Sequence, residues 1–200
     1  TEMINPLICL IFGYLIGSLN FAIVYSKLRG DDIRRHGSGN AGATNVLRVY
    51  GKGSAALVFT LDILKGVFAV ILARLIFRSE AAQCAAALGA VLGHNFPVYY
   101  GFSGGKGVAT SFATLLALDA RVALCALAVF ALVLIISRYV SLSSIAASAA
   151  VVIFSFVFDR KLDEFTIMCT VMGALCIIRH HSNISRLIRG TENKLGHKSA

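Results

Sequence analysis

Seven apolar runs, separated by short polar segments, dominate the sequence and leave few folds open to it. They are residues 6–25, 54–77, 81–92, 108–118, 122–136, 145–158 and 165–178. A helix of about 20 apolar residues crosses the roughly 30 Å hydrocarbon layer of a bilayer, and no run here alternates as a strand does. The chain is 57% hydrophobic and 14% charged, whereas soluble domains average about 45–50% and about 25%. We therefore predict an all-α integral membrane protein with about seven transmembrane helices, built as a single domain over residues 1–200.

Two of these runs, 81–92 and 108–118, are shorter than the usual span of about 17–25 residues. Each is expected to be either a half-span or a full helix lengthened by its neighbours. The first run is preceded by no basic segment, so we expect a retained helix and no cleaved signal peptide. Asp62 and Lys65 stand three residues apart in the second run, which predicts a structural ion pair on one helix face inside the membrane.

The basic residues predict how the chain is oriented. Seven crossings place residues 26–53, 93–107, 138–144 and the tail from 179 on one face, with thirteen Lys and Arg residues, Lys198 included. The other face holds only Arg78, Arg121, Arg160 and Lys161. By the positive-inside rule the loops and the C-terminus are cytoplasmic and the N-terminus is outside. The net charge of +9 therefore needs no nucleic-acid partner, and five cysteines without C-x-x-C spacing predict no metal or cofactor.

The segment from Gly93 to Thr110 reads GHNFPVYYGFSGGKGVAT and is the best candidate for an anion site. Gly104, Gly105 and Gly107 leave the backbone unshielded, so successive N–H groups can point at one oxyanion while Lys106 balances its charge. A helix beginning at the apolar run that follows would add the donors of its N-terminus. These features predict a phosphate site; the alternative is a glycine-rich membrane turn with a lysine that reaches the lipid surface.

Two other motifs are weighed for the same segment. A Walker A loop fails, because Tyr100 and Gly107 stand where that motif needs Gly and Ser or Thr. The pattern G-x-S-x-G does occur around Ser103, with Asp119 and His180 later in the chain. A serine hydrolase, however, needs a strand before this turn and a parallel sheet around it, and neither is predicted here.

Two more polar clusters are expected on the same face as the glycine loop. The first is the small, glycine-rich stretch from Ser38 to Arg48, and the second runs from Arg179 to Arg186. In the second, His180 and Asn183 are expected to project from one helix face. Together the clusters could hold two anionic groups, although Arg186 and Arg189 could equally contact lipid headgroups.

Three segments carry a resemblance: GSGNAGATNVLR, GHNFPVYYGFSGGKGVAT and RHHSNISRLIRGTENK. In this order they resemble the signature segments of the bacterial acyl-phosphate:glycerol-3-phosphate acyltransferase family (PlsY), and the surrounding spans extend the likeness over essentially the whole chain. The resemblance implies a cell inner membrane enzyme that moves a fatty acyl group from acyl phosphate to the 1-hydroxyl of sn-glycerol 3-phosphate. Lysophosphatidic acid and phosphate are the products, in the first step of bacterial phospholipid synthesis, without acyl carrier protein, acyl-CoA or a cofactor.

The resemblance also implies the site residues. The catalytic candidates are Ser38, Arg48, Lys106, His180 and Asn183, and the substrate-binding candidates are Asn40, Thr44, Asn45, Gly104, Gly105, Gly107, Ser141 and Ser144. Acyl phosphate already has a good leaving group, so the enzyme chiefly has to position two phosphates and a hydroxyl and to stabilise the developing oxyanion. Either His180 or a substrate phosphate oxygen can take the hydroxyl proton.

A second class of function fits part of the pattern. In an organophosphate transporter, half-helix N-termini such as that expected at Val108 bind the substrate near mid-membrane. Such a site usually lies between two repeats, and the sequence shows no internal repeat.

Overall fold

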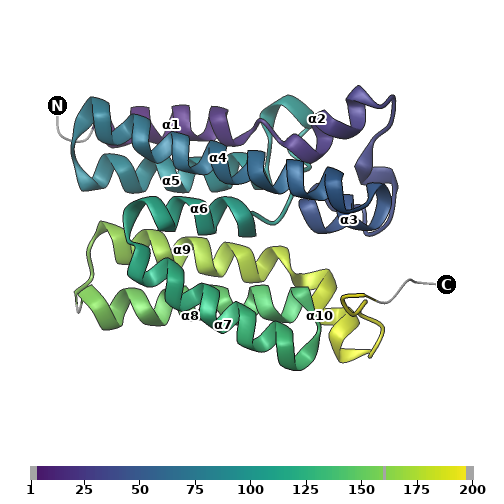
Figure 1. Ribbon diagram of the computed structural model, residues 1–200. Coiled ribbons are helices and arrows are strands. Elements are labelled where there is room, and N and C mark those ends of the chain that lie inside the picture. The colour runs from purple at the N-terminus through teal and green to yellow at the C-terminus, as the bar shows by residue number, and fades with distance from the viewer. Residues whose placement is uncertain (1–3, 160, 197–200) are drawn as a thin grey trace. The chain divides into compact units, whose positions relative to one another are not determined.

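A computed structural model describes residues 4–159 and 161–196, and all regular elements in this part of the chain are helices (Figure 1). Arg160 and Lys198 from the charge count lie outside it. The chain divides into two compact units, Thr1–Leu118 and Asp119–Ala200.

The first unit is built on three long helices that contact one another and appear side by side in Figure 1: α1 (Ile4–Gly17), α4 (Lys52–Phe77) and α5 (Glu80–Asn95). Its shorter elements are α2 (Phe21–Leu28), the 3-10 turn η1 (Ile33–Arg35), α3 (Ala43–Tyr50), the 3-10 turn η2 (Val98–Tyr100) and α6 (Val108–Leu118), which packs on α4.

Glycines bring α1 and α5 into close contact. A Cβ atom on Gly13 or Gly17 would overlap the carbonyl oxygen of Ala86 or Ala90, and one on Gly89 would overlap that of Leu10. Gly13 and Gly17 stand four residues apart, the spacing that lets transmembrane helices approach closely through small residues. This tight pair fixes the end of α5, from which the glycine loop begins.

The first apolar run is interrupted, contrary to the single continuous helix expected over residues 6–25. Helix α1 ends at Gly17, and Asn20 caps α2 by accepting a hydrogen bond of 3.1 Å from the Ile23 N–H. The Asn20 amide also donates to the carbonyl of Ala41 at 3.1 Å and lies 3.5 Å from that of His94. The break is thus stabilised by partners distant in sequence, which a local reading of the run does not reveal.

The second unit is an up-and-down arrangement of α7 (Ala120–Ser137), α8 (Val140–Asp159) and α9 (Glu164–Arg179), followed by the short helix α10 (His181–Ile188). Helix α8 packs against both α7 and α9. Gly173 allows the second contact, because a Cβ there would lie 2.8 Å from the Val152 side chain. After α10 the chain returns to the α7–α8 turn, where the Leu195 N–H donates to the carbonyl of Arg138 at 2.8 Å.

All seven apolar runs form helices, which confirms the predicted all-α membrane architecture. Four segments of the described chain are long and apolar enough to cross a membrane: residues 5–28, 52–77, 120–137 and 140–158. Large apolar side chains such as Phe68 and Ile135 are exposed on them, as lipid contact requires. Helix α6 has the predicted bounds, whereas α5 continues to Asn95 and α8 begins at Val140, so the loops expected to start at 93 and to extend to 144 are shorter.

Candidate active site

The loop before α3 is organised by Asn45. Its Oδ1 accepts a hydrogen bond of 2.9 Å from the Ser38 N–H, and its Nδ2 donates to the carbonyls of Ile33 and His36 at 3.2 and 2.9 Å. Asn45 is 1% exposed and both of its amide hydrogens are used. Asn45, expected to bind substrate, has a structural role in this structure, because its amide holds the Ser38 loop in place.

The other candidates of this segment are at least partly accessible to solvent. Ser38 and Arg48 are exposed, while Asn40 and Thr44 are half-buried. Arg48 lies on α3, which begins at Ala43. An exposed arginine and an exposed hydroxyl are both suited to binding a phosphate from solution.

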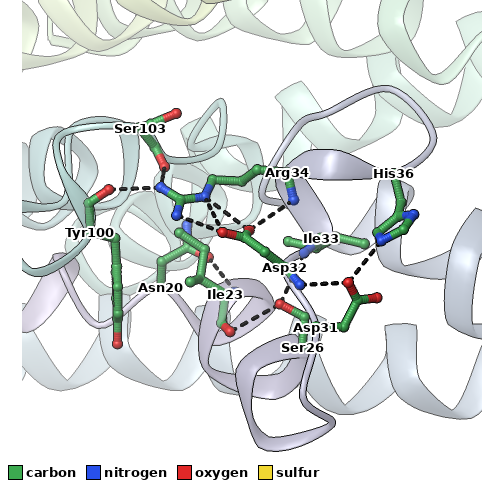
Figure 2. A network of polar contacts seen from close by, with 10 residues as sticks. All are labelled: Asn20, Ile23, Ser26, Asp31, Asp32, Ile33, Arg34, His36, Tyr100 and Ser103. Atoms are coloured by element: carbon green, nitrogen blue, oxygen red, sulfur yellow. Dashed lines mark hydrogen bonds and ion pairs between the residues drawn. The ribbon is translucent and has the colours of Figure 1, made fainter.

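Arg34 joins this loop to the segment that leads into the glycines (Figure 2). Its guanidinium pairs with Asp32 at 2.7 Å and donates from Nη1 to the carbonyls of Tyr100 at 2.7 Å and Ser103 at 3.5 Å. The hydrogen bonds from Arg34 lower the pKa of Asp32 to about 2, so this pair is ionised at neutral pH. The two loops are therefore locked to each other by a charged fork.

A second carboxylate, Asp31, supports the same loop. Tyr50 donates to it at 2.6 Å and His36 lies 2.7 Å from it. The bonds from Tyr50 and His36 lower the pKa of Asp31, whereas burial, reinforced by Asp31, raises the pKa of Tyr50 to about 12. Tyr50 thus stays a donor over the whole physiological range.

The glycine loop is closely packed, and two of its N–H groups form hydrogen bonds within the protein. Gly104 N–H donates to the Asn95 carbonyl at 3.2 Å, and Gly105 N–H donates to the His94 carbonyl at 3.0 Å. The expectation that these two N–H groups bind an oxyanion is corrected by this structure, because they tie the loop to the end of α5. Glycine is required at 105 because a Cβ there would overlap the His94 ring.

The N-terminus of α6 is the part of this segment that can receive an anion. The N–H groups of Gly107, Val108 and Ala109 donate to no acceptor among the described residues. Lys106 is half-buried immediately before them, and Gly107 is buried at a φ of +81°. Backbone donors of this kind, at the positive end of a helix dipole, are the groups that bind anions at helix N-termini, so the predicted anion site stays a prediction at this place.

Asn95 adds a second sign of a ligand at this place. Its side chain is 0% exposed, yet within the described ranges neither Oδ1 nor Nδ2 has a hydrogen-bond partner. It is directed at the backbone of Gly107, since a Cβ on that glycine would lie 2.8 Å from Oδ1. A buried amide without partners is rare and calls for an explanation; a bound polar group beside Gly107 supplies one.

The second unit has its own polar cluster, centred on Glu192. This carboxylate is 8% exposed and accepts hydrogen bonds from Ser141 at 3.1 Å, Asn183 at 2.9 Å and Arg186 at 2.7 Å. Burial would raise the pKa of this carboxyl, but the bonds from its three partners, that from Arg186 foremost, outweigh burial and lower it. Arg186 is therefore committed to a protein partner and not solely to lipid headgroups.

His180 lies at the junction of α9 and α10, not inside one helix together with Asn183 as expected. It is 2% exposed, and its Nδ1 lies 2.7 Å from the Cys176 carbonyl oxygen. A carbonyl oxygen can only accept, so Nδ1 of the neutral ring carries the hydrogen and Nε2 is the acceptor. His180 thus has the tautomer that a general base acting through Nε2 needs.

Ser141 and Ser144 lie in the first turns of α8, and only Ser141 joins the Glu192 cluster. The Ser144 hydroxyl donates to the Val140 carbonyl of its own helix at 2.9 Å. The hydrolase alternative loses its basis, because no strand precedes Ser103 in the described chain and Asp119 caps α7 while paired with Arg121.

Sequence reasoning missed three polar residues that organise these clusters: Asn20, His94 and Glu192. Each has at least one partner distant in sequence, such as Ser141 for Glu192, so its adjacent residues do not reveal its role. The one available signal was that each is a polar residue within or beside an apolar or signature segment.

Comparison with known proteins identifies the family of this chain. The family model for glycerol-3-phosphate acyltransferase matches residues 7–190. The glycerol-3-phosphate acyltransferase of Thermoanaerobacter sp. (strain X514) is 45% identical, over 94% of this chain and 95% of its own length. That of Aquifex aeolicus (strain VF5) is 43% identical, over 95% of this chain and 99% of its own length.

Solved structures extend the match to the fold. The crystal structure of PlsY (YgiH), an integral membrane glycerol 3-phosphate acyltransferase, in its glycerol 3-phosphate form is 43% identical, covers 96% of both chains and has a TM-score of 0.89. Its lysophosphatidic acid form gives a TM-score of 0.86. These findings favour the acyltransferase over the transporter, and they show that this multi-pass membrane protein belongs to the glycerol-3-phosphate acyltransferase family.

Proposed function

We propose that this chain transfers a fatty acyl group from acyl phosphate to the 1-hydroxyl of sn-glycerol 3-phosphate, giving lysophosphatidic acid and inorganic phosphate. The hydroxyl oxygen forms a bond to the acyl carbon, the anhydride C–O bond breaks, and the hydroxyl proton leaves with phosphate after transfer. No acyl carrier protein, acyl-CoA or metal takes part. The relatives and the solved forms support the acceptor, since one form holds glycerol 3-phosphate and the other lysophosphatidic acid.

The observation that carries the proposal is the α6 N-terminus, where unpartnered backbone donors lie beside Lys106 and the unsatisfied Asn95 amide. Fixed N–H groups and a cation stabilise both a bound phosphate and the negative charge that develops in transfer. Ser38, exposed on the loop before α3, and Arg48, exposed on α3, provide ligands for a second phosphate. The first unit thus has two groups of donors, one for each of the two anionic substrates.

His180 and Asn183 are proposed to act on the attacking hydroxyl. Nε2 of His180 is the acceptor nitrogen of its ring, so it can orient the hydroxyl and take its proton. A phosphate oxygen of the substrate, with a second pKa near 6, is the rival acceptor. Asn183 donates a hydrogen bond of 2.9 Å to Glu192, which fixes the orientation of its side chain.

We also propose that both units belong to one domain and that the enzyme lies in the bacterial inner membrane. The family model and the relatives span both units, which supports one catalytic domain. The excess of Lys and Arg on one set of loops supports cytoplasmic site loops and C-terminus, with the N-terminus outside.

Purified protein in lipid bilayers tests the donor. Palmitoyl phosphate, palmitoyl-CoA and palmitoyl-acyl carrier protein are supplied separately with labelled glycerol 3-phosphate. We expect labelled lysophosphatidate from palmitoyl phosphate alone, lost in Lys106→Ala and kept in the control Lys52→Ala, whose exposed side chain lies at the start of α4. Lipid formed from palmitoyl-CoA at an equal rate would refute the proposed donor.

A further inference from the structure

We propose that His94 is a positioning residue. Lys65 and Asp62 hold its ring in the tautomer that carries the hydrogen on Nε2, and the ring packs against the glycine loop and keeps the loop in place. The role of His94, Lys65 and Asp62 in phosphate binding rests on the proposed function. The tautomer itself does not, because it follows from contacts within the first unit.

The three side chains form a buried charged cluster where membrane helix α4 meets the end of α5. Asp62, Lys65 and His94 are 1%, 5% and 4% exposed. Lys65 Nζ lies 2.7 Å from Asp62 Oδ1, which confirms the predicted ion pair. Charges at such a depth are costly, and they usually serve a function.

The contacts of Lys65 decide where the hydrogen of His94 is. Nζ also lies 2.9 Å from the carbonyl oxygen of Leu19 and 3.0 Å from His94 Nδ1. An ammonium group has three donors and no acceptor, so Nδ1 must accept and the hydrogen of the neutral ring is on Nε2. A hydrogen on Nδ1 would face the ammonium at 3.0 Å, and the alternative acceptor, Asp62 Oδ1, is farther from Nδ1, at 3.5 Å.

The helix break described above supplies part of this arrangement. Because α1 ends at Gly17 and α2 begins at Phe21, the Leu19 carbonyl lies outside both helices and is open to Lys65. The Phe21 ring covers the same ammonium, with Nζ 5.6 Å from its centroid. The interruption of the first membrane helix thus provides a backbone acceptor for the Lys65 ammonium group.

The far side of the His94 ring meets the glycine loop. A Cβ on Gly105 would overlap His94 Nε2, and the Gly105 N–H is bonded to the His94 carbonyl at 3.0 Å. The ring therefore lies between the Asp62–Lys65 pair and the backbone that leads to Lys106 and α6. Nε2 is the ring atom that lies against that backbone, so a ring turned out of this position would displace the loop.

The experiment has a spectroscopic arm and a binding arm. The tautomer of His94 is read by nitrogen-15 NMR of histidine-labelled full-length protein in bilayers, with His94→Gln to assign the signal. Binding of glycerol 3-phosphate is measured by calorimetry. The test variant is Asp62→Asn/Lys65→Met, which removes both charges together so that neither is left unpaired in the membrane. The matched control is Thr114→Val, a buried polar change on α6.

In the parent protein and the control we expect the hydrogen on Nε2. In the double variant we expect loss of that preference and glycerol 3-phosphate binding weaker by about tenfold, as for loss of one charge-assisted hydrogen bond. A hydrogen on Nδ1 in the parent, or unchanged binding by a folded double variant, would overturn the inference. If the parent shows the Nε2 tautomer but makes no lysophosphatidate, the proposed function fails while the tautomer stands.

Discussion

The Arg34 Nη1 atom donates a hydrogen bond of 2.7 Å to the carbonyl oxygen of Tyr100, which joins two loops 66 residues apart in the sequence (Figure 2). Asp32 holds the opposite edge of the same guanidinium through Nε and Nη2. The position of the glycine loop relative to the Ser38 loop is therefore set by a planar fork between a carboxylate and a backbone carbonyl.

This contact predicts the effect of Arg34→Lys. A lysine keeps the charge but cannot bond Asp32 and Tyr100 in one plane, so we expect the KM for glycerol 3-phosphate to rise about tenfold, with a smaller change in kcat. The control is Arg35→Lys at the adjacent exposed position. Equal kinetics for the two variants would show that the fork does not position the loops.

The close approach of α1 and α5 predicts opposite outcomes for two changes from glycine to alanine. Gly89→Ala drives a methyl group into the Leu10 carbonyl, and we expect it to lower the free energy of unfolding by about 1–3 kcal/mol. Gly53→Ala, with open space around it near the start of α4, is expected to be neutral or to stabilise by up to about 1 kcal/mol. Thermal unfolding in detergent measures both, and a Gly89→Ala protein as stable as the parent would contradict the packing.

The sequence predicted the seven helical segments well and the contacts between them poorly. Helix α6 was predicted with its observed bounds because its apolar run stands between a glycine loop and a capping aspartate. The break before α2 was missed because Asn20 is held by carbonyls of Ala41 and His94, far along the chain. The extension of α5 was missed because Gly93 looks like a loop residue locally, although packing on α1 requires it.

The same distinction holds at the candidate site. Residue type and order indicated Lys106, Arg48 and His180, because phosphate chemistry selects cations and imidazoles. The structural role of Asn45 was not predicted, because the backbone groups that a buried amide bonds are brought to it by the fold, and here they belong to its own loop. Glu192 was missed because the sequence does not show that the chain after α10 turns back, which lets this carboxylate accept hydrogen bonds from Asn183, Arg186 and the distant Ser141.

Glu192 predicts a dependence of stability on pH. Its pKa is lowered in the folded state, so the stabilisation is complete above the unfolded value of about 4.3 and is lost as pH falls through the lower folded value. We expect Glu192→Gln to unfold at lower temperature than the parent at pH 7, with the difference shrinking in acid. Glu164→Gln, at an exposed position in α9, should lack this effect. A difference that stays constant down to pH 3 would contradict the ionised cluster.

The tautomer of His180 predicts that replacing this residue changes the pH dependence of the rate. Because its Nε2 is an acceptor, we expect His180→Ala to lower kcat by about 10²–10⁴-fold and to remove the rise in rate as pH passes the imidazole range. The exposed neighbour His181→Ala is the control. A His180→Ala enzyme that keeps the pH profile of the parent while binding substrate weakly would assign the proton to the substrate phosphate and leave His180 a positioning role.

The central claim is transfer of the acyl group itself, and product stoichiometry tests it most directly. Purified protein in sealed bilayer vesicles receives palmitoyl phosphate and labelled glycerol 3-phosphate, while lysophosphatidate, phosphate and free fatty acid are followed together. The account predicts one lysophosphatidate, acylated at the 1-hydroxyl, and one phosphate for each palmitoyl phosphate consumed, with no free fatty acid from the enzyme. Phosphate released with fatty acid and no lipid, or labelled glycerol 3-phosphate accumulating unchanged inside the vesicles, would contradict it.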